Sequence, residues 1–531
     1  MPLILPGNSR LIDRRLFLSG VAGVSAAAAL AATPATKADA ATTPARSKDD
    51  PFTLGIASGD PTPSGVVLWT RLAPKPFEPN GGMPPGHPVV EWRLATDAGM
   101  RNVVRDGSAH APAQLGHSVH VEVEGLEPDS EYFYEFKFRN HWSPVGRTKT
   151  LPAPGADVRQ LDFAFASCQK WDDGFFPSYS HMAAENLDFV VHLGDYVYEY
   201  EIGADGGLRR TPVPAAAQPA PQTLEQWRAR YALYKSDPDL QAAHARFPFI
   251  VTWDDHEVQN DYAGGWEGQT QAFTAVRAAA YMAYYEHQPL RARSLPQGTD
   301  MQLYRRLRYG RLAQLDVLDG RQYRDAPPCG WGEAQACEAA YDPAISMLGP
   351  EQEQWLYAGL RDSDVRWNIL GNNVMVSRLD HDGAAGELLW HDAWDGFPAA
   401  RKRLLDVIAG PAVRNAVFVT GDWHSTFVND VHLDFDRPDS PVVATEFVGT
   451  SISTNGDVPV YGPYYEPMIG FNPHIKFFDG DRRGYVRCQV TPERWRTELR
   501  MATGVGSRAA GQYTHAVFEV EDGAPGAVQV S

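Results

Sequence analysis

The sequence predicts an α/β fold preceded by an all-β domain, and three observations support this prediction. The chain has 531 residues, of which 43% are hydrophobic and 21% charged, so it can bury more than one core. From Phe52 to about Leu151, short strand patterns are separated by Gly, Pro and Asp turns. From Leu161 onward, strand patterns alternate with helical patterns, which is typical of a layered α/β domain.

Residues 1–40 have the order of an export signal. A twin-arginine pattern at Arg14 and Arg15 precedes a mildly apolar Gly/Ala-rich stretch and a small-x-small cleavage pattern at 38–40. We therefore predict a twin-arginine signal peptide, the twin-arginine export machinery as a partner, and a periplasmic, cell-wall or extracellular location. No other segment is long and apolar enough to span a bilayer, so no integral membrane span is expected. Residues 41–50 are predicted to be a linker.

Residues 51–153 are predicted to form an immunoglobulin- or fibronectin-like β-sandwich. Strand patterns lie at 66–70, 89–94 and 117–123. The segment 126–136 then resembles the tyrosine corner that leads into a late strand of fibronectin-type sandwiches. We expect this domain to have a structural role, packing against the next domain.

Residues 158–515 are predicted to form the α/β domain, followed by a C-terminal tail at 516–531. The expected strands are 161–167, 187–193, 249–253, 367–370 and 415–420. The expected helices are 176–186, 223–236 and 270–286. An insert rich in Ala, Pro and Gln at 212–221 is expected in a surface loop.

The acidic balance of the chain disfavours nucleic acid as a partner. The formal net charge is -18, from 66 acidic and 48 basic residues, and no segregated basic face is visible. This acidity suits a protein that holds hard cations on oxygen ligands. We expect a monomer.

The four cysteines are too few for a disulfide scaffold. Cys329 and Cys337 close a short loop and are predicted to form a disulfide after export, the alternative being two unpaired thiols. Cys488 lies in an alternating strand pattern, where a buried thiol is expected. Cys168 differs because it directly follows a predicted core strand.

Every predicted core strand of the α/β domain is followed by polar or metal-capable residues. Open α/β sheets bind ligands at the carboxyl ends of their strands, so we expect these side chains to meet. Two adjacent cations in such a site supply much of what phosphate-ester hydrolysis requires. The five clusters are Ser167-Cys168-Gln169, Gly194-Asp195-Tyr196-Val197-Tyr198, Asp254-Asp255-His256-Glu257, Gly371-Asn372-Asn373 and Gly421-Asp422-Trp423-His424-Ser425.

These motifs resemble those of the calcineurin-like metallophosphoesterases, and in particular of the PhoD family. The resemblance implies a four-layer metallophosphoesterase β-sandwich flanked by helices, and it spans nearly the whole chain after the signal. Two further motifs, at 55–61 and 67–72, are similar to the N-terminal domain of that family. The motifs that carry the resemblance in the α/β domain are 165–169, 192–199, 252–257, 321–325, 421–425 and 446–451.

The resemblance also implies a site with Fe(III) beside calcium. Soft thiolate and phenolate donors suit the ferric ion, and carboxylates suit calcium. Two zinc or manganese ions are the alternative, and the carboxylates at Asp255 and Asp422 disfavour zinc at the second site. By motif, the iron ligands are Cys168, Asp195, Tyr198 and His424, and the calcium ligands are the bridging Asp195 together with Asp255 and Asp422.

Several roles stay open between alternatives. Asn373 is a further candidate calcium ligand, with Asn372 equally placed and a plain turn as the third interpretation. Tyr196 could replace Tyr198 by sequence alone. Asp254 is expected to cap a turn or to support a ligand.

Two residues are predicted to be catalytic. His256 is expected to assist the leaving oxygen. Arg321 is expected to clamp the phosphoryl oxygens, the alternative being a salt-bridge network that also includes Arg324.

The sequence therefore predicts an exported alkaline phosphatase or phosphodiesterase that hydrolyses phosphate mono- and diesters with a metal-activated water or hydroxide. A phospholipase D-like activity on phospholipids is the alternative enzyme function, and an exposed apolar rim around the site would favour it. A secreted binding protein without catalytic activity is the alternative from another class. It predicts gaps in the ligand series, and the sequence shows none. A C-terminal segment folded over the site would restrict the enzyme to small esters.

Overall fold

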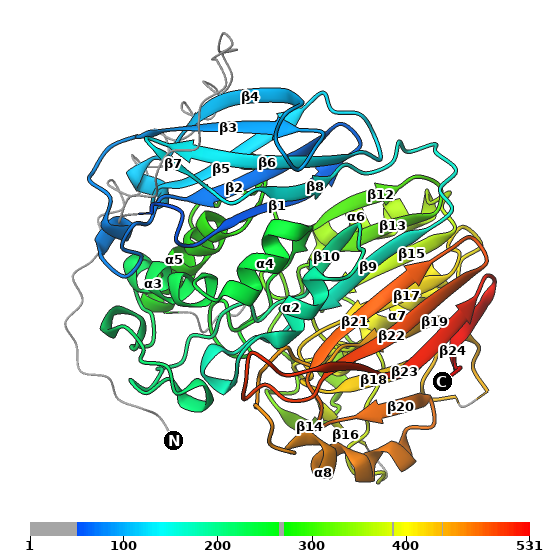
Figure 1. Cartoon of the computed structure of the whole chain (residues 1–531). Helices are drawn as coiled ribbons and strands as arrows, with labels where there is room; N and C mark the ends of the chain where they lie inside the picture. The colour runs from blue at the N-terminus through cyan, green and yellow to red at the C-terminus, as the bar shows by residue number, and fades with distance from the viewer. Residues whose placement is uncertain (1–49, 265–269, 385–386, 438) are drawn as a thin grey trace.

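The computed structural model describes residues 50–264, 270–384, 387–437 and 439–531, and two large sheets form its centre (Figure 1). The predicted signal at 1–40 and nearly all of the linker therefore lie outside the described residues. Strands β9, β10 and β11 of the larger sheet run parallel to one another. The larger sheet has ten strands in the order β24 (Ala524–Gln529), β23 (Gln512–Glu521), β22 (Arg494–Ala502), β21 (Gly484–Val490), β9 (Leu161–Ala166), β10 (Phe189–His192), β11 (Pro248–Val251), β1 (Ile56–Thr62), β2 (Gly65–Arg71) and β5 (Ser118–Glu124).

The second sheet faces the first across a shared apolar core. Phe163, Val191 and Trp495 of the first sheet pack with Ile369 and Val419 of the second. Strands β13, β15, β17 and β19 of the second sheet are parallel. Its seven strands follow the order β12 (Arg305–Tyr309), β13 (Ala313–Val317), β15 (Trp367–Asn372), β17 (Ala416–Thr420), β19 (Val442–Val448), β18 (Thr426–His432) and β20 (Ile475–Asp479).

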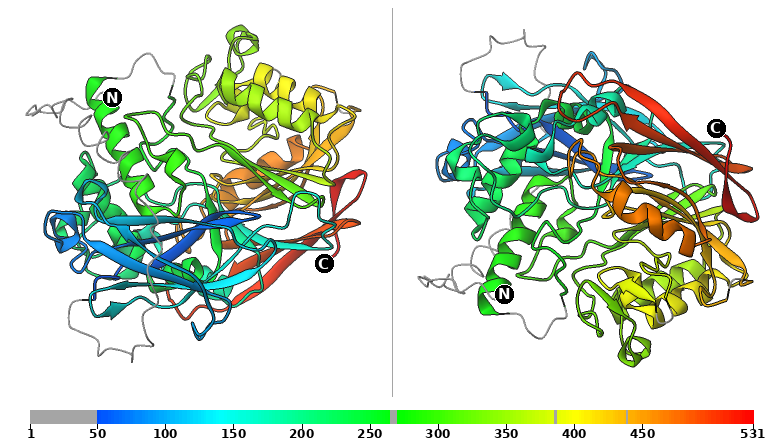
Figure 2. Two further views of the ribbon diagram at one scale, coloured as in Figure 1. Left: turned by 90° about the horizontal axis from the view of Figure 1, so that it is seen from above. Right: turned by 90° about the horizontal axis from the view of Figure 1, so that it is seen from below.

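Helices cover the outer faces of both sheets. α2 (Pro177–Ala183), α3 (Leu224–Lys235), α4 (Pro238–Arg246) and α5 (Gln271–His287) pack on the ten-stranded sheet. α6 (Pro350–Arg361) and α7 (Pro398–Ile408) pack on the seven-stranded sheet. Figure 2 shows these two helices on the side of the molecule away from the N-terminal strands. The three predicted helices correspond to α2, α3 and α5, and Thr223 begins α3 with a capping box that includes Gln226.

The N-terminal region shares a sheet with the α/β domain, which the sequence did not indicate. A separate five-stranded sheet contains β4 (Val103–His110), β3 (Val89–Ala95), β6 (Glu131–Phe138), β7 (His141–Trp142) and β8 (Gly146–Lys149). It shares a core with β2 and β5. The predicted tyrosine corner is present, because the Tyr132 hydroxyl accepts a hydrogen bond of 3.0 Å from the Glu127 backbone N–H.

Strand β1, however, pairs in parallel with β11 and so extends the sheet of the α/β domain. A Cβ atom at Gly59 would lie 2.5 Å from the backbone oxygen of Phe249, so only glycine allows this close approach. The pairing covers the edge of β11, which would otherwise present unpaired backbone groups. The region is therefore not a sandwich that merely packs against its neighbour.

Residues 516–531, predicted to be a tail, instead form the end of β23 and all of β24. The alternating pattern at Ala516, Phe518 and Val520 places these side chains in the core between the large sheets. β23 lies three strands from β9, and β24 lies four strands from it at the sheet edge.

A small ribbon lies on the seven-stranded side of the molecule. It pairs β14 (Glu333–Gln335) with β16 (Leu388–Trp390). The predicted disulfide is confirmed: Cys329 and Cys337 flank β14 and are bonded, with a Cα–Cα distance of 5.6 Å. α8 (Tyr461–Tyr465) lies beside this ribbon and contacts it through a hydrogen bond from the Tyr464 hydroxyl to Glu333.

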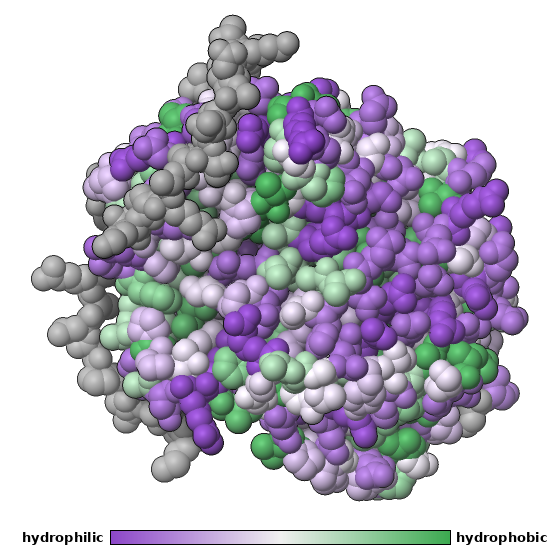
Figure 3. Space-filling view, in the orientation of Figure 1, coloured by the Kyte–Doolittle hydropathy of each residue, from purple (hydrophilic) through white to green (hydrophobic). Residues whose placement is uncertain are grey.

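The surface over β21–β23 is mostly hydrophilic, as Figure 3 shows. Charges of both signs alternate there, for example in the pairs Arg487–Glu498 and Arg496–Glu519. Within the described ranges, no helix combines the length and the apolar character that crossing a membrane requires.

Candidate metal centre

The carboxyl ends of strands from both large sheets meet at one site. β9 and β10 lead into Cys168 and Asp195, and β11 leads into Asp254 and Asp255. β17, from the other sheet, leads into the segment that carries Asp422 and His424. Because each sheet contributes part of the donors, the site depends on the packing of the two sheets against one another.

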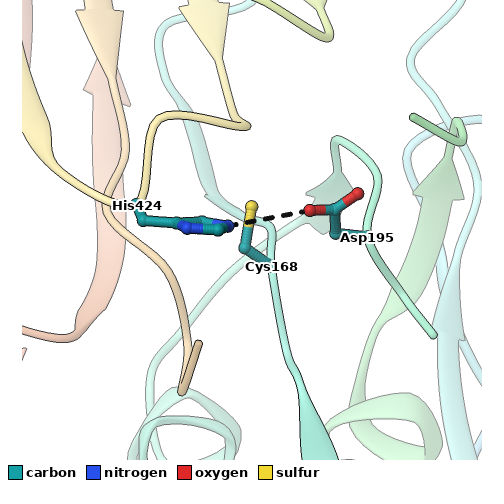
Figure 4. Close-up of side chains that lie close together, drawn as sticks. All are labelled: Cys168, Asp195 and His424. Atoms are coloured by element: carbon teal, nitrogen blue, oxygen red, sulfur yellow. Dashed lines mark ion pairs between the residues drawn. The ribbon is translucent and has the colours of Figure 1, made fainter. Parts of the chain in front are cut away.

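The first donor cluster contains Cys168, Asp195 and His424, whose ligand atoms all lie within 4.8 Å of one another (Figure 4). Nε2 of His424 is 3.8 Å from Oδ2 of Asp195. The hydroxyl of Tyr198 donates to the same Asp195 oxygen at 2.8 Å and lies 3.2 Å from Nε2 of His424. The four residues predicted around the iron are thus brought together. Tyr196 is not, because its hydroxyl is hydrogen-bonded to His244 at 2.8 Å.

The second donor cluster contains Asp254, Asp255 and Asp422, and a third, overlapping group contains Asp195, Asp255 and His256. Asp195 and Asp255 therefore link the two clusters through the third group, and Asp195 is the residue predicted to bridge the two cations. One oxygen of Asp195 and one of Asp254 are buried without a hydrogen-bond partner among the described residues. Carboxylate oxygens left in this way are suited to a cation.

The donor set also fits metal ions by its chemistry. Thiol, phenol, imidazole and carboxylate groups surround the first cluster, whereas the second consists of carboxylates alone. The former set suits a transition metal and the latter a hard cation such as calcium. Asp254, expected only to cap a turn or to support a ligand, lies within the carboxylate cluster, and the assignment of ligands to metals stays a prediction.

Burial and the neighbouring carboxylates raise the pKa values of three of these donors in the absence of cations. Burial, with the Asp195 carboxylate as the next cause, raises the pKa of the Cys168 thiol well above its usual value. Burial raises the pKa of Tyr198 well above its usual range, and Asp195 adds to this effect. Burial and the neighbouring Asp254 likewise raise the pKa of Asp422. A bound cation would oppose all these shifts, so metal binding should release protons.

Four of the candidate ligands have left-handed backbone conformations. Cys168, Asp195, Asp422 and His424 have φ angles of 59°, 56°, 66° and 50°. Such angles are uncommon in residues other than glycine, and they concentrate at functional sites. The sharp turns direct each side chain back toward the ends of the strands.

His256 lies at the edge of the site with its ring held in place. Nδ1 is 2.9 Å from Oε2 of Glu199, and the ring packs on Tyr198 at a centroid distance of 4.2 Å. Burial alone would lower the pKa of His256, but Asp255, Asp195 and Glu199 raise it well above its usual value. The imidazole is thus prepared to carry a proton.

Arg321 does not have the position predicted for a phosphoryl clamp. Its side chain is fully buried, with Nε donating to Asp254 at 2.5 Å and Nη1 donating to Asp392 at 2.7 Å. Nη2 lies 3.8 Å from Asp255 and 3.9 Å from Asp422. The salt-bridge alternative is the one that this geometry supports, and Arg324 joins the network through Asp392.

The amide of Asn373 is occupied by the protein itself. Its oxygen accepts from the Gly320 backbone N–H at 2.8 Å, and its nitrogen donates to the Trp253 backbone oxygen. The neighbouring Asn372 is similarly engaged with Val374 and Trp394. Ligation by either asparagine stays a prediction.

Sequence reasoning missed several residues that shape the site. Glu257 accepts backbone hydrogen bonds from Asp195, Tyr196 and Asp254, and so it fixes two ligand loops together. Thr454 places its hydroxyl 2.8 Å from that of Tyr198. Glu257 belongs to the 252–257 motif, but its role in joining the two ligand loops is visible only from its hydrogen bonds.

Comparisons with known proteins agree with this geometry. Residues 163–499 match the family model described as PhoD-like phosphatase, and residues 36–152 match its N-terminal domain. Alkaline phosphatase D of Bacillus subtilis (strain 168) is 45% identical over 99% of this chain and 90% of that protein. A solved structure titled "Structure of PhoD" superposes with a TM-score of 0.86 at 45% identity, covering 92% of this chain and 93% of that chain.

Proposed function

Since the chain belongs to the PhoD-like phosphatase family and is a metal-dependent phosphoesterase, we propose that it hydrolyses phosphate mono- and diesters at a site that holds Fe(III) and calcium. The observation that carries the proposal is the pair of donor clusters linked by Asp195 and Asp255. Cys168, Asp195, Tyr198 and His424 would hold the iron. Asp195, Asp255 and Asp422 would hold calcium, with Asn373 as a further candidate.

When bound, the cations would neutralise the phosphoryl oxygens and acidify the attacking water. The residues of the chain supply positioning and proton transfer. Glu199 holds Nδ1 of His256, so Nε2 would carry the proton that reaches the leaving oxygen. Arg321 would act as a positioning residue that fixes Asp254 and faces Asp255 and Asp422 with its remaining nitrogen.

The test uses purified full-length protein and combines hydrolysis with metal analysis. p-Nitrophenyl phosphate and bis(p-nitrophenyl) phosphate report monoesterase and diesterase activity. We expect about one iron together with calcium, and an activity that falls at least about 100-fold in Asp195→Asn. Active protein with zinc or manganese in both positions would contradict the proposed metals but not the hydrolysis.

We also make proposals about the fold, the cellular location and the oligomeric state. We propose that the two large sheets and their helices form the four-layer arrangement, with a sandwich-like N-terminal region, and that the protein is an exported monomer. Replacement of Arg14 and Arg15 by Lys should leave the protein in the cytoplasm if the twin-arginine route is used. Light scattering on the purified protein tests the oligomeric state.

A phospholipid substrate is the second candidate, and one surface feature favours it. Residues 458–471 expose Val458, Val460, Tyr464 and Phe471, by 43–60%. Tyr461 in the same segment lies 3.5 Å from Nδ1 of His424. Release of alcohol from phospholipid vesicles, reduced in Val460→Asp with unchanged hydrolysis of bis(p-nitrophenyl) phosphate, would support this candidate.

A further inference from the structure

The hydroxyl of Thr454 lies between two of the predicted iron ligands. Thr454 is 2% exposed and belongs to the segment that follows β19. Its Oγ1 is 2.7 Å from the backbone oxygen of Cys168 and 2.8 Å from the hydroxyl of Tyr198. The Ser451 hydroxyl donates to the Thr454 backbone oxygen at 3.0 Å and helps to hold the segment in place. One small polar group therefore contacts the backbone of one ligand and the donor atom of another.

The single hydrogen of this hydroxyl is already in use. A threonine hydroxyl has one hydrogen to donate and two lone pairs that accept. The Cys168 carbonyl oxygen can only accept, so the hydrogen points to it. The Lys170 backbone N–H donates to Oγ1 at 3.2 Å and fills one lone pair. The second lone pair is left for Tyr198, whose hydroxyl also lies 2.8 Å from Oδ2 of Asp195. In the metal-free protein, Thr454 is thus an acceptor toward Tyr198.

A metal bound to Tyr198 changes which group must donate. The phenolate, which is the form that binds a ferric ion, has lost its hydrogen to solvent and can only accept. Two acceptors 2.8 Å apart repel one another unless the Thr454 hydroxyl turns its hydrogen toward the phenolate. The Cys168 oxygen tolerates this rotation, because the backbone N–H groups of Ser453 and Thr454 also donate to it, at 3.4 and 3.3 Å. A hydrogen bond to an ionised acceptor is also roughly twice as strong as one to a carbonyl oxygen.

We propose that Thr454 is a positioning residue that donates a hydrogen bond to the Tyr198 phenolate and thereby limits how much charge this ligand gives to the metal. The proposal rests on the part of the proposed function that makes Tyr198 an iron ligand. Hydrogen bonds to ligand atoms withdraw electron density from them, and such contacts tune the affinity and the reduction potential of a bound metal. Only the hydroxyl of Thr454 rotates, and none of its covalent bonds forms or breaks.

The test is the visible absorption band of the iron-loaded, full-length protein. Thr454→Val keeps the shape of the side chain and removes the hydroxyl. Without the hydrogen bond, the phenolate gives charge to iron more readily, so we expect the band to move to longer wavelength by at least about 10 nm. The ferric ion should also become harder to reduce with dithionite. Thr454→Ser keeps the hydroxyl and should restore both properties.

Thr450→Val is the matched control. Thr450 is 1% exposed, and its hydroxyl lies 3.2 Å from the backbone oxygen of another predicted ligand, His424, and 2.6 Å from that of Arg482. Within the described chain, this hydroxyl makes no hydrogen bond to Tyr198. The control therefore removes a buried hydroxyl that touches the backbone of a ligand, and its absorption band should stay at the wild-type wavelength.

A purely structural role of Thr454 would give a different result. Thr454→Val would then contain less iron or have a lower Tm, but the band of the remaining iron would keep the wild-type wavelength, and this outcome refutes the proposal. A shift of equal size in Thr454→Ser or in Thr450→Val would refute it as well. If Thr454→Val does not fold, resonance Raman spectra of the wild type in ordinary and heavy water decide. A donated hydrogen shifts the phenolate–iron vibration, and an unshifted vibration refutes the proposal.

The outcomes also separate this proposal from the proposed function. Protein that hydrolyses p-nitrophenyl phosphate but shows no phenolate band would refute the role of Thr454 and leave the hydrolysis standing. Protein that shows the band, and its shift in Thr454→Val, but hydrolyses neither monoesters nor diesters would refute the proposed function and leave the role of Thr454 standing.

Discussion

Replacement of Arg321 by methionine tests whether this residue supports the ligands or clamps the substrate. The guanidinium is fully buried and pairs with Asp254 and Asp392. Removing one partner of a buried ionic group typically costs about 3–5 kcal/mol, because the remaining charges stay uncompensated. Unfolding entropy is about 2.1 cal/mol/K per residue, so roughly 470 described residues give about 1 kcal/mol/K. We therefore expect the Tm of metal-free Arg321→Met to fall by about 3–5 °C.

The assay is thermal unfolding followed by tryptophan fluorescence in excess chelator. Arg308→Met is the matched control, since Arg308 pairs with Asp364 at the surface and such pairs contribute about 0–1 kcal/mol. In the double variant with Asp254→Asn, the two losses should be less than additive, because the variants remove the same interaction. If Arg321→Met keeps the wild-type Tm but has a raised KM and weaker inhibition by phosphate, the supporting role is refuted. The data would then favour Arg321 as a residue that clamps the phosphoryl oxygens.

Three further predictions follow from the same structure. Tyr198→Phe should abolish the visible absorption band expected from a phenolate on iron, and a band that persists would remove Tyr198 from the ligand set. Burial lowers the pKa of His474 to about 4, so between about pH 6.5 and 4 the unfolded chain binds a proton that the folded protein does not. His474 alone should therefore contribute a loss of about 3 kcal/mol to the stability of the metal-free protein as pH decreases through this window. His474→Gln, which keeps a donor near the Arg378 carbonyl, should remove this part of the decrease in pH-dependent unfolding. Replacing both Cys329 and Cys337 by Ser should lower the Tm by about 2–3 °C, because the disulfide that closes a loop of this length contributes about 2.5 kcal/mol to stability. The double variant and the wild type with its disulfide reduced should then unfold at the same Tm.

The strand-end rule found most of the candidate site from sequence. Cys168, Asp195, Asp255 and His424 each follow a predicted strand, and parallel strands carry such positions to one edge. Asp392 could not be found in this way. It follows the short β16 and pairs with Arg321 across 71 residues, and ionic contacts at that separation leave no local pattern.

The pairing of β1 with β11 was hidden for a similar reason. Periodicity identifies a strand and its buried face, but it does not specify which edge another strand will cover. The register joins Ser58 to Pro248, residues far apart in the chain. The strand pairing of 516–531 was not predicted, although hydrophobic residues alternate at 516–520, because periodicity alone does not show which neighbouring strand will pair with such a segment.

The four left-handed donor residues also bear on how this protein would change by mutation. Each left-handed residue other than glycine costs about 1 kcal/mol, and burial of the Asp195 carboxyl adds to the cost in the metal-free chain. Glycine at any of the four positions would relieve the backbone strain. If stability were the only requirement, substitutions that remove these donors would therefore be favoured. A chain kept only as a binding scaffold would have no reason to retain Cys168 and His424 in these conformations. Metal binding therefore explains the left-handed conformations of Cys168 and His424, whereas stability alone does not.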